Sequence, residues 1–175
     1  AACSVLVART TTPRDGPIIV GVNGSSSSEQ ALDFAFETAA RQQEELVVVR
    51  AVASGSGNGT GGDPLAALTD LVAARADKYH LDAQVRVLPG EPEAVLVAAS
   101  MWAGSVIIGA RGQRPYQGLL GSAAQTLLHH SPAPIILVRG ATPVVETLWS
   151  RTIGPARPYP SGVMLLMMPT EAPPA

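Results

Sequence analysis

Short apolar runs alternate with amphipathic stretches between residues 17 and 140, and this alternation limits the possible folds more than any other feature of the sequence. The apolar runs predict strands at 18–22, 46–52, 84–88, 105–109 and 135–138. Apolar residues at helical spacing predict helices at about 27–42, 64–79 and 122–130, and a further helix from residue 92. Such alternation indicates an α/β fold with a parallel sheet covered on both faces.

We expect a three-layer α/β/α sandwich whose five-stranded parallel sheet has the order 3-2-1-4-5, with the strands numbered along the chain. In such sheets, ligands bind beyond the carboxyl ends of the strands, where the winding direction reverses. The reversal falls between the first and fourth strands, so the turn after Val22 should meet the loop after Gly109. The topology therefore predicts a ligand site between these two loops.

The loop between Gly109 and Ser122 has the composition of a phosphate-binding loop. Glycine at 109 and 112 would allow positive φ and a close approach to a ligand without a Cβ in the way. The helix that begins near Ser122 would direct free N–H groups and the positive end of its dipole into the same space. The alternative is a glycine-rich surface loop that binds nothing.

Several side chains near this loop have two interpretations. Ser122 is expected to be the helix N-cap, either alone or while also contacting a phosphate. Arg111 and Arg114 would neutralise phosphates or simply be solvated. Helix C-termini favour positive charge, so capping is preferred to metal binding or catalysis for His80, His129 and His130. No Ser-His-Asp triad or carboxylate pair can be assembled at the strand ends, so no catalytic residue is expected.

A second glycine-rich segment, residues 54–63, is interpreted differently. It lacks the Gly-Lys-Ser/Thr ending of a phosphate loop, and no strand leads directly into a tight turn there. We therefore expect a flexible linker.

Composition excludes several classes of protein. A length of 175 residues suits one domain, and a net charge of -2 gives no electrostatic reason to expect nucleic acid. The longest apolar runs fall far short of the roughly 18 residues that cross a bilayer.

Cys3 is the only cysteine, which excludes an internal disulfide and suits a reducing cytoplasm. Because the chain begins at Ala1 without a signal peptide, we expect a fragment.

The two ends of the chain are expected to lie outside the main domain, which spans 17–140. The run that begins at Cys3 and the run 133–143 both have a small residue, four apolar residues and an arginine, followed by Thr and Pro, so we interpret 1–16 as the last strand and linker of an upstream copy. Chance similarity is the alternative. Residues 4–8 should then pair antiparallel with residues 135–138. The tail, 141–175, is expected to have low order, although its apolar run 163–168 could shield an edge.

Three sequence blocks resemble the universal stress protein family. The blocks are Val20-Gly21-Val22-Asn23-Gly24-Ser25, then Gly109-Ala110-Arg111-Gly112 with Gly121-Ser122, and finally His129-His130-Ser131-Pro132-Ala133-Pro134-Ile135. The resemblance covers residues 17–140. It implies a five-stranded fold of the adenine nucleotide alpha hydrolase type and a dimer made by pairing the last strands. In one branch it also implies tight ATP binding without an evident catalytic residue, and tandem copies are common.

Matched by position, the resemblance implies a nucleotide site built mostly from backbone. The adenosine end would contact Gly21, Val22, Asn23 and Ala51; the phosphates would contact Gly109, Ala110, Arg111, Gly112, Gly121, Ser122, Ala123 and Ala124. The implied ligand is ATP, with or without Mg2+. The ATP-binding branch has Asp in place of Asn23. It also separates its second and third glycines by nine residues, whereas Gly112 and Gly121 enclose eight, and both departures should weaken binding.

Three functions remain to be compared. The first is an ATP-binding regulatory module in which nucleotide occupancy alters a dimer or partner surface. The second is a dimerising scaffold of the same fold without nucleotide. The third is an ATPase or adenylating enzyme, which is the least favoured because Mg2+ at the phosphates would find Ser122 but no nearby acid.

Overall fold

The computed structural model describes residues 4–8, 15–52, 63–110, 120–139 and 163–167. Within these residues the strands are β1 (Ser4–Ala8), β2 (Ile18–Gly21), β3 (Leu46–Val52), β4 (Ala83–Pro89), β5 (Ser105–Gly109), β6 (Ile135–Val138) and β7 (Val163–Met167). The helices are α1 (Ser26–Gln42), α2 (Pro64–Tyr79), α3 (Pro92–Ser100) and α4 (Ser122–His130). The linker predicted at 54–63 lies outside the described residues except for Asp63.

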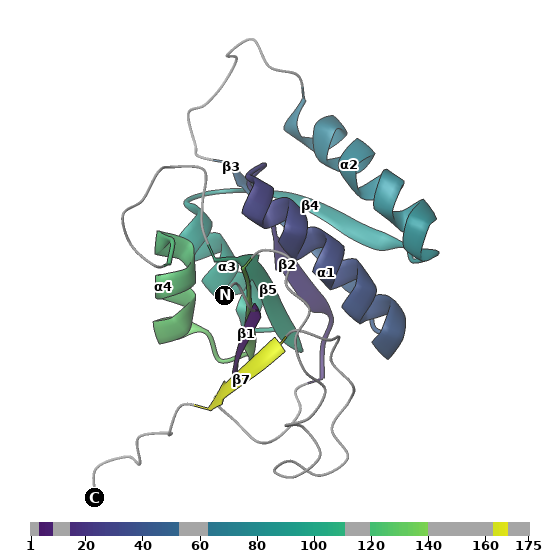
Figure 1. Ribbon diagram of the computed structural model, residues 1–175. Helices are drawn as coiled ribbons and strands as arrows, with labels where there is room; N and C mark the ends of the chain where they lie inside the picture. The colour runs from purple at the N-terminus through teal and green to yellow at the C-terminus, as the bar shows by residue number, and fades with distance from the viewer. Residues whose placement is uncertain (1–3, 9–14, 53–62, 111–119, 140–162, 168–175) are drawn as a thin grey trace, which may run out of the picture.

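All seven strands form one sheet in the order β4-β3-β2-β5-β6-β1-β7. The five strands from β4 to β6 are parallel, which confirms the predicted order 3-2-1-4-5. Strand β1 pairs antiparallel with β6, as the sequence predicts, with Leu6 opposite Ile136. The sheet therefore extends beyond the predicted five strands at its β6 side (Figure 1).

Strand β7 was not predicted as an element. It pairs in parallel with β1, from Ser4 opposite Val163 to Ala8 opposite Met167, and lies beside β1 in Figure 1. An isolated apolar run carries no period of its own, and its pairing depends on an edge supplied by a segment more than a hundred residues earlier. The rest of the predicted low-order tail lies outside the described residues.

Two hydrophobic clusters fill the space on either side of the sheet. Alternate strand residues serve opposite faces: Val20 packs with α1 and α2, whereas Ile19 packs with α3 and α4. The helices therefore form the two outer layers of the predicted sandwich (Figure 1). None of the helices in the described part of the chain is long and apolar enough to cross a membrane.

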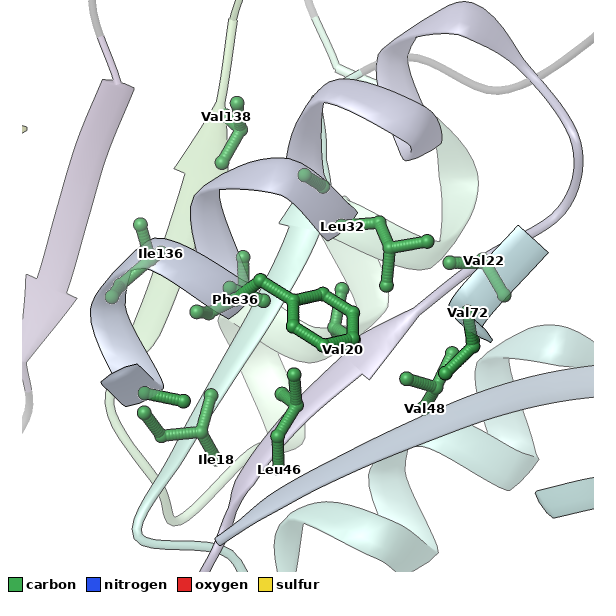
Figure 2. Packing of buried hydrophobic residues seen from close by; sticks show 14 of the residues in the cluster. Ile18, Val20, Val22, Leu32, Phe36, Leu46, Val48, Val72, Ile136 and Val138 are labelled. Atoms are coloured by element: carbon green, nitrogen blue, oxygen red, sulfur yellow. The ribbon is translucent and has the colours of Figure 1, made fainter. Parts of the chain in front are cut away.

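Phe36 is the largest fully buried side chain of the α1 side. Its ring lies over the sheet beside Val20 in Figure 2, and it stacks on Tyr79 of α2 with 5.8 Å between ring centroids. Phe36 therefore joins the sheet to both helices of this layer, because one ring contacts a strand below it and a helix beside it.

Gly109 is the last residue of β5 and does not have the positive φ that the sequence suggested for it. The space around its Cα explains the residue: a Cβ there would lie 2.5 Å from Ser27 Oγ and 2.7 Å from the Ser27 carbonyl carbon and oxygen. The first turn of α1 thus lies directly on Gly109. At Gly21 a Cβ would meet Leu96 Cδ2 at 2.9 Å, so this glycine admits a side chain of α3.

Replacing Phe36 by Ala should lower the free energy of unfolding by about 3–5 kcal/mol, since a fully buried aromatic ring is lost and a cavity remains. Urea denaturation followed by circular dichroism measures the change. Phe34→Ala is the matched control on the same helix, because Phe34 is only partly buried and should cost less. Equal losses for both variants would contradict the assignment of Phe36 as the ring that joins the layers.

Gly109→Ala and Gly21→Ala should each destabilise the fold, by about 1–3 kcal/mol, because each adds a methyl group to filled space. The two sites should differ in a double-mutant cycle. Leu96→Ala should remove most of the cost at Gly21, where the nearest atom to a Cβ is the end of the Leu96 side chain and Ile108 Cγ2 lies at 3.2 Å. Ser27→Ala should not remove the cost at Gly109, whose neighbours include Ser27 backbone atoms. Full rescue by Ser27→Ala would show that the backbone approach is not the constraint.

Candidate functional site

Two loops meet at the carboxyl edge of the sheet. Strands β2 and β5 are neighbours, with Gly21 opposite Ile108, and the helices that follow them are α1 and α4. Both helices therefore begin at the same edge, on either side of the point where the winding reverses. The predicted ligand edge thus brings together the turn after β2, the end of β5 and the start of α4.

The turn after β2 is fixed by its own polar groups. Asn23 Oδ1 accepts a hydrogen bond from the Ser25 backbone amide at 3.0 Å, and the backbone amide of Asn23 donates to Ser28 Oγ at 3.3 Å. Ser28 Oγ in turn donates to the Ser25 carbonyl at 2.8 Å. Asn23 is exposed, so its side chain reaches this edge while one of its acceptor sites serves the turn.

Ser26 and Glu29 have the spacing of a capping box, which predicts Ser26 as the N-cap of α1, but the structure has the cap one residue earlier. Ser25 is the N-cap, and its side chain accepts a hydrogen bond from the Ser28 amide at 3.2 Å. Four consecutive serines offer the same side chain at each position, so the turn geometry set by Asn23 selects the cap. The helix therefore begins at Ser26.

The loop that follows β5 is closed at its base by hydrogen bonds. The Ala110 amide donates to the Val138 carbonyl at 3.0 Å, and the Ala110 carbonyl accepts from the Gly121 amide at 2.9 Å. Gln125 Nε2 also donates to the Leu120 carbonyl, at 3.3 Å. The amides of Ala110 and Gly121 therefore already donate within the loop base, although the family resemblance implies phosphate contacts for both residues.

The start of α4 leaves backbone donors available. Gly121 is the N-cap and makes no side-chain cap, so Ser122 is the first helical residue and not the predicted N-cap. The first intrahelical bond runs from the Gln125 amide to the Gly121 carbonyl. The amides of Ser122, Ala123 and Ala124 precede it and donate to no described residue. As the first amides of the helix, they point out of its N-terminus, where the positive end of the helix dipole lies.

Most other predicted site residues can offer only backbone to a ligand. Val22 and Ala124 are buried in the two hydrophobic clusters, and Ala51 and Ala123 pack against the cluster on the α3 side. The Val22 amide donates to the Val49 carbonyl at 2.9 Å. Because Ala51 lies on β3, two strands from β5, it belongs to the far end of an extended site. Arg111, Gly112 and Arg114 lie outside the described residues.

Two residues near the site were missed by sequence reasoning. Ser27 contacts Gly109, and Gln125 holds the end of the loop through Leu120. The run of serines beside the turn could have indicated Ser27, since such a run marks the start of a helix. A glutamine in the first turn of a helix is too common a feature to indicate Gln125.

The chemistry of the described site is that of neutral donors. No charged side chain is among its described members, and no group of three or more His, Cys, Asp or Glu residues gathers anywhere in the described residues. The arrangement can bind an anion through main-chain amides and accept an apolar or hydrogen-bonding group along β2 and β3.

Comparisons with known proteins identify the family. The model of the universal stress protein family matches residues 16–139. A universal stress protein of Mycobacterium tuberculosis is 32% identical over 137 residues, which cover 73% of this chain and 46% of the relative. A universal stress protein A family protein of Schizosaccharomyces pombe is 28% identical over 145 residues, covering 69% of this chain and 44% of the relative. The chain therefore spans about half the length of these curated relatives.

Solved structures have the same fold. The universal stress protein UspA from Lactobacillus plantarum superposes with a TM-score of 0.61 at 20% identity, covering 73% of this chain and 100% of that one. A universal stress protein in complex with cAMP has a TM-score of 0.56 at 27% identity, covering 70% and 95%. With the family model matching residues 16–139 and the sheet in the expected order, the chain belongs to the universal stress protein family.

Proposed function

We propose that this domain binds an adenine nucleotide, with ATP as the ligand, and acts in the stress response through nucleotide-dependent regulation without strong catalysis. The observation that carries the proposal is the row of amides at Ser122, Ala123 and Ala124, which donate to no described residue and begin α4 at the edge where the topology predicts a ligand. The 27% identical relative in complex with cAMP supports an adenine nucleotide as the ligand class.

The phosphates would bind at the start of α4. Three adjacent amides and a helix dipole favour an anion, and Gly121 presents no side chain that would compete with it. The amides of Ala110 and Gly121 hold the loop base and leave the phosphates to the helix. Any contribution from Arg111 or Gly112 would add to these donors.

The adenosine end would extend along β2 and β3. Its proposed contacts are the backbone of Gly21 and Val22, the side chain of Asn23, and Ala51. Asn23 Oδ1 accepts the Ser25 amide, and an amide oxygen, with two lone pairs, can accept more than one hydrogen bond. An amide supplies no charge, which is consistent with weaker binding than an aspartate would give.

A scaffold without nucleotide is the second candidate. It is favoured by the hydrogen bonds that already engage Asn23, Ala110 and Gly121, because each of these serves the fold without a ligand. Calorimetric titration separates the two, since a scaffold would give no heat of binding with ATP. A weak ATPase is the third candidate and lacks a carboxylate for Mg2+ among the described site residues.

Ser122→Pro should weaken ATP binding by about tenfold or more, because it removes one amide that donates to a charged phosphate. Proline is well tolerated as the first helical residue, and Gly121 already has an extended conformation, so α4 should persist. Isothermal titration of wild type and variant with ATP measures the difference. Circular dichroism checks that the helix content is unchanged.

Ser122→Ala is the matched control, because it deletes the hydroxyl and keeps the amide. Its affinity should stay close to that of the unmodified protein, since the proposed donor is the backbone amide and the N-cap of α4 is Gly121, not Ser122. If the alanine variant loses as much affinity as the proline variant, the hydroxyl is the ligand contact and the main-chain account is wrong. If neither variant nor the unmodified protein binds ATP, AMP or cAMP, the scaffold function replaces the proposal.

Removing Mg2+ with a chelator should change ATP affinity little, because the described site supplies amides and no acidic ligand for the metal. Titrations in the presence of Mg2+ and of EDTA make the comparison. A strong requirement for Mg2+, together with measurable phosphate release, would favour the ATPase candidate.

A further inference from the structure

We propose that Arg139 supplies the positive charge of the phosphate site, and that the site therefore selects adenine nucleotides by the charge of their phosphates. ATP would bind more tightly than AMP, and AMP more tightly than cAMP. The inference rests on the proposed nucleotide function and adds a residue that neither the sequence motifs nor the family resemblance assign to the site. It follows from the place of Arg139 in the sheet, the face on which its side chain lies, and the charges of its neighbours.

Arg139 lies beside the residue that closes the loop base. The parallel pairing of β5 and β6 ends with Gly109 opposite Val138. The hydrogen bond from the Ala110 amide to the Val138 carbonyl, at 3.0 Å, continues the same ladder by one residue, so Ala110 lies opposite Arg139. The Ala110 carbonyl accepts the Gly121 amide at 2.9 Å. The peptide group that joins Val138 to Arg139 is therefore linked to the N-cap of α4 through Ala110 alone.

The alternation of side chains along β6 places Arg139 on the face of the sheet that α4 covers. Ile136 and Val138 belong to the hydrophobic cluster on the α1 side, where Figure 2 shows them. Leu137 belongs to the opposite cluster, together with Leu127 of α4. Successive side chains of an extended chain point to opposite faces, so Arg139 shares the face of Leu137.

The first amides of α4 lie at the same edge and on the same face. Helix α4 packs on β6, and its amides from Ser122 to Ala124 donate to no described residue. A guanidinium binds phosphate oxygens through parallel N–H groups, which a row of backbone amides does not prevent. Arg139 would therefore contact one side of a phosphate chain while the amides of α4 contact another.

No described acidic side chain neutralises Arg139. The ion pairs in the described part of the chain join Arg75 to Asp33 and Arg41 to Glu37, all on α1 and α2. Strands β5 and β6 and helix α4, which surround the half-buried Arg139, contain no aspartate or glutamate. An anion bound at the start of α4 would supply the opposite charge, and a charge-assisted hydrogen bond is stronger than a neutral one.

The arginine and the amides would contribute to affinity in different ways. The amides and the helix dipole carry partial charges and accept a phosphate oxygen of any nucleotide. A full positive charge gains more attraction with each negative charge on the ligand. The phosphate chain of ATP carries more negative charge than the phosphate of AMP, and the cyclic diester of cAMP carries the least. Arg139 would therefore set the order of affinity among these ligands.

Calorimetric titration of the full-length chain with ATP, AMP and cAMP, all in EDTA, tests the inference. Arg139→Gln should weaken ATP binding by about tenfold or more, because a charged hydrogen bond to phosphate is lost, and cAMP binding by only about twofold. Arg139→Lys keeps the charge without the forked donors, so its ATP affinity should lie between those of Arg139→Gln and the unmodified protein. Arg41→Gln is the matched control, because it removes the same charge from the last turn of α1, about 20 Å along the helix from the ligand edge. Its ATP affinity should stay within about twofold, since charges at this distance are screened.

The dependence of affinity on salt gives a second measurement that needs no variant. In the unmodified protein, raising the NaCl concentration should weaken ATP binding more than cAMP binding, because the larger ligand charge is screened more strongly. Equal salt dependence for the two ligands would contradict selection by charge. This comparison decides the matter if circular dichroism shows that Arg139→Gln does not fold.

The possible failures are distinguishable. A folded Arg139→Gln chain that binds ATP as tightly as the unmodified protein would overturn the role of Arg139 and leave the nucleotide function standing. Equal losses of ATP and cAMP affinity in this variant would show that Arg139 supports the fold of the site and does not select by charge. If the unmodified protein binds none of the three nucleotides, the proposed function fails, and the inference fails with it.

Discussion

The contact between the first turn of α1 and Gly109 sets the shape of the ligand edge. Ser27 lies where a Cβ of Gly109 would be, so helix and strand approach at backbone distance. This approach holds the turn after β2 against the end of β5, while Asn23 and Ser28 fix the turn from its other side. The two loops that converge at the switch point are therefore positioned by packing and by local hydrogen bonds, before any ligand contributes.

The proposed nucleotide site at this edge would use few distinctive side chains. The amides of Ala110 and Gly121 close the loop base, and the next amides, from Ser122 to Ala124, donate to no residue in the described part of the chain. The side chains of Ala123 and Ala124 pack in or against the hydrophobic core, so packing constrains which side chains fit at these positions. The hydrogen-bond donors are backbone amides, which every residue except proline supplies. A site of this kind depends on the position of a helix start more than on residue identity.

The sequence predicted the strand order, the bounds of β3, β5, β6, α2 and α4, and the pairing of β1, because each rests on local period or on the edge left by the last strand. It misplaced both caps by one residue, since Ser25 and Gly121 are selected by turn geometry and not by composition. It suggested positive φ at Gly109, whereas the structure has no positive φ there and a Cβ is excluded by Ser27, a residue of a different element. Long-range approach of this kind has no local signature, and the same holds for β7.

Strand β6 links the loop base to the outer edge of the sheet. On one side the Val138 carbonyl holds the Ala110 amide at 3.0 Å, and Ala110 in turn holds Gly121 at the start of α4. On the other side β6 pairs with β1 through the three residues that precede Val138. A four-residue strand cannot shift along one neighbour without moving relative to the other, because it is paired on both sides over nearly its whole length. A ligand whose affinity depends on the register of β6 therefore changes the free energy of the pairing between β6 and β1. By thermodynamic linkage, that pairing changes the binding free energy of the ligand by the same amount.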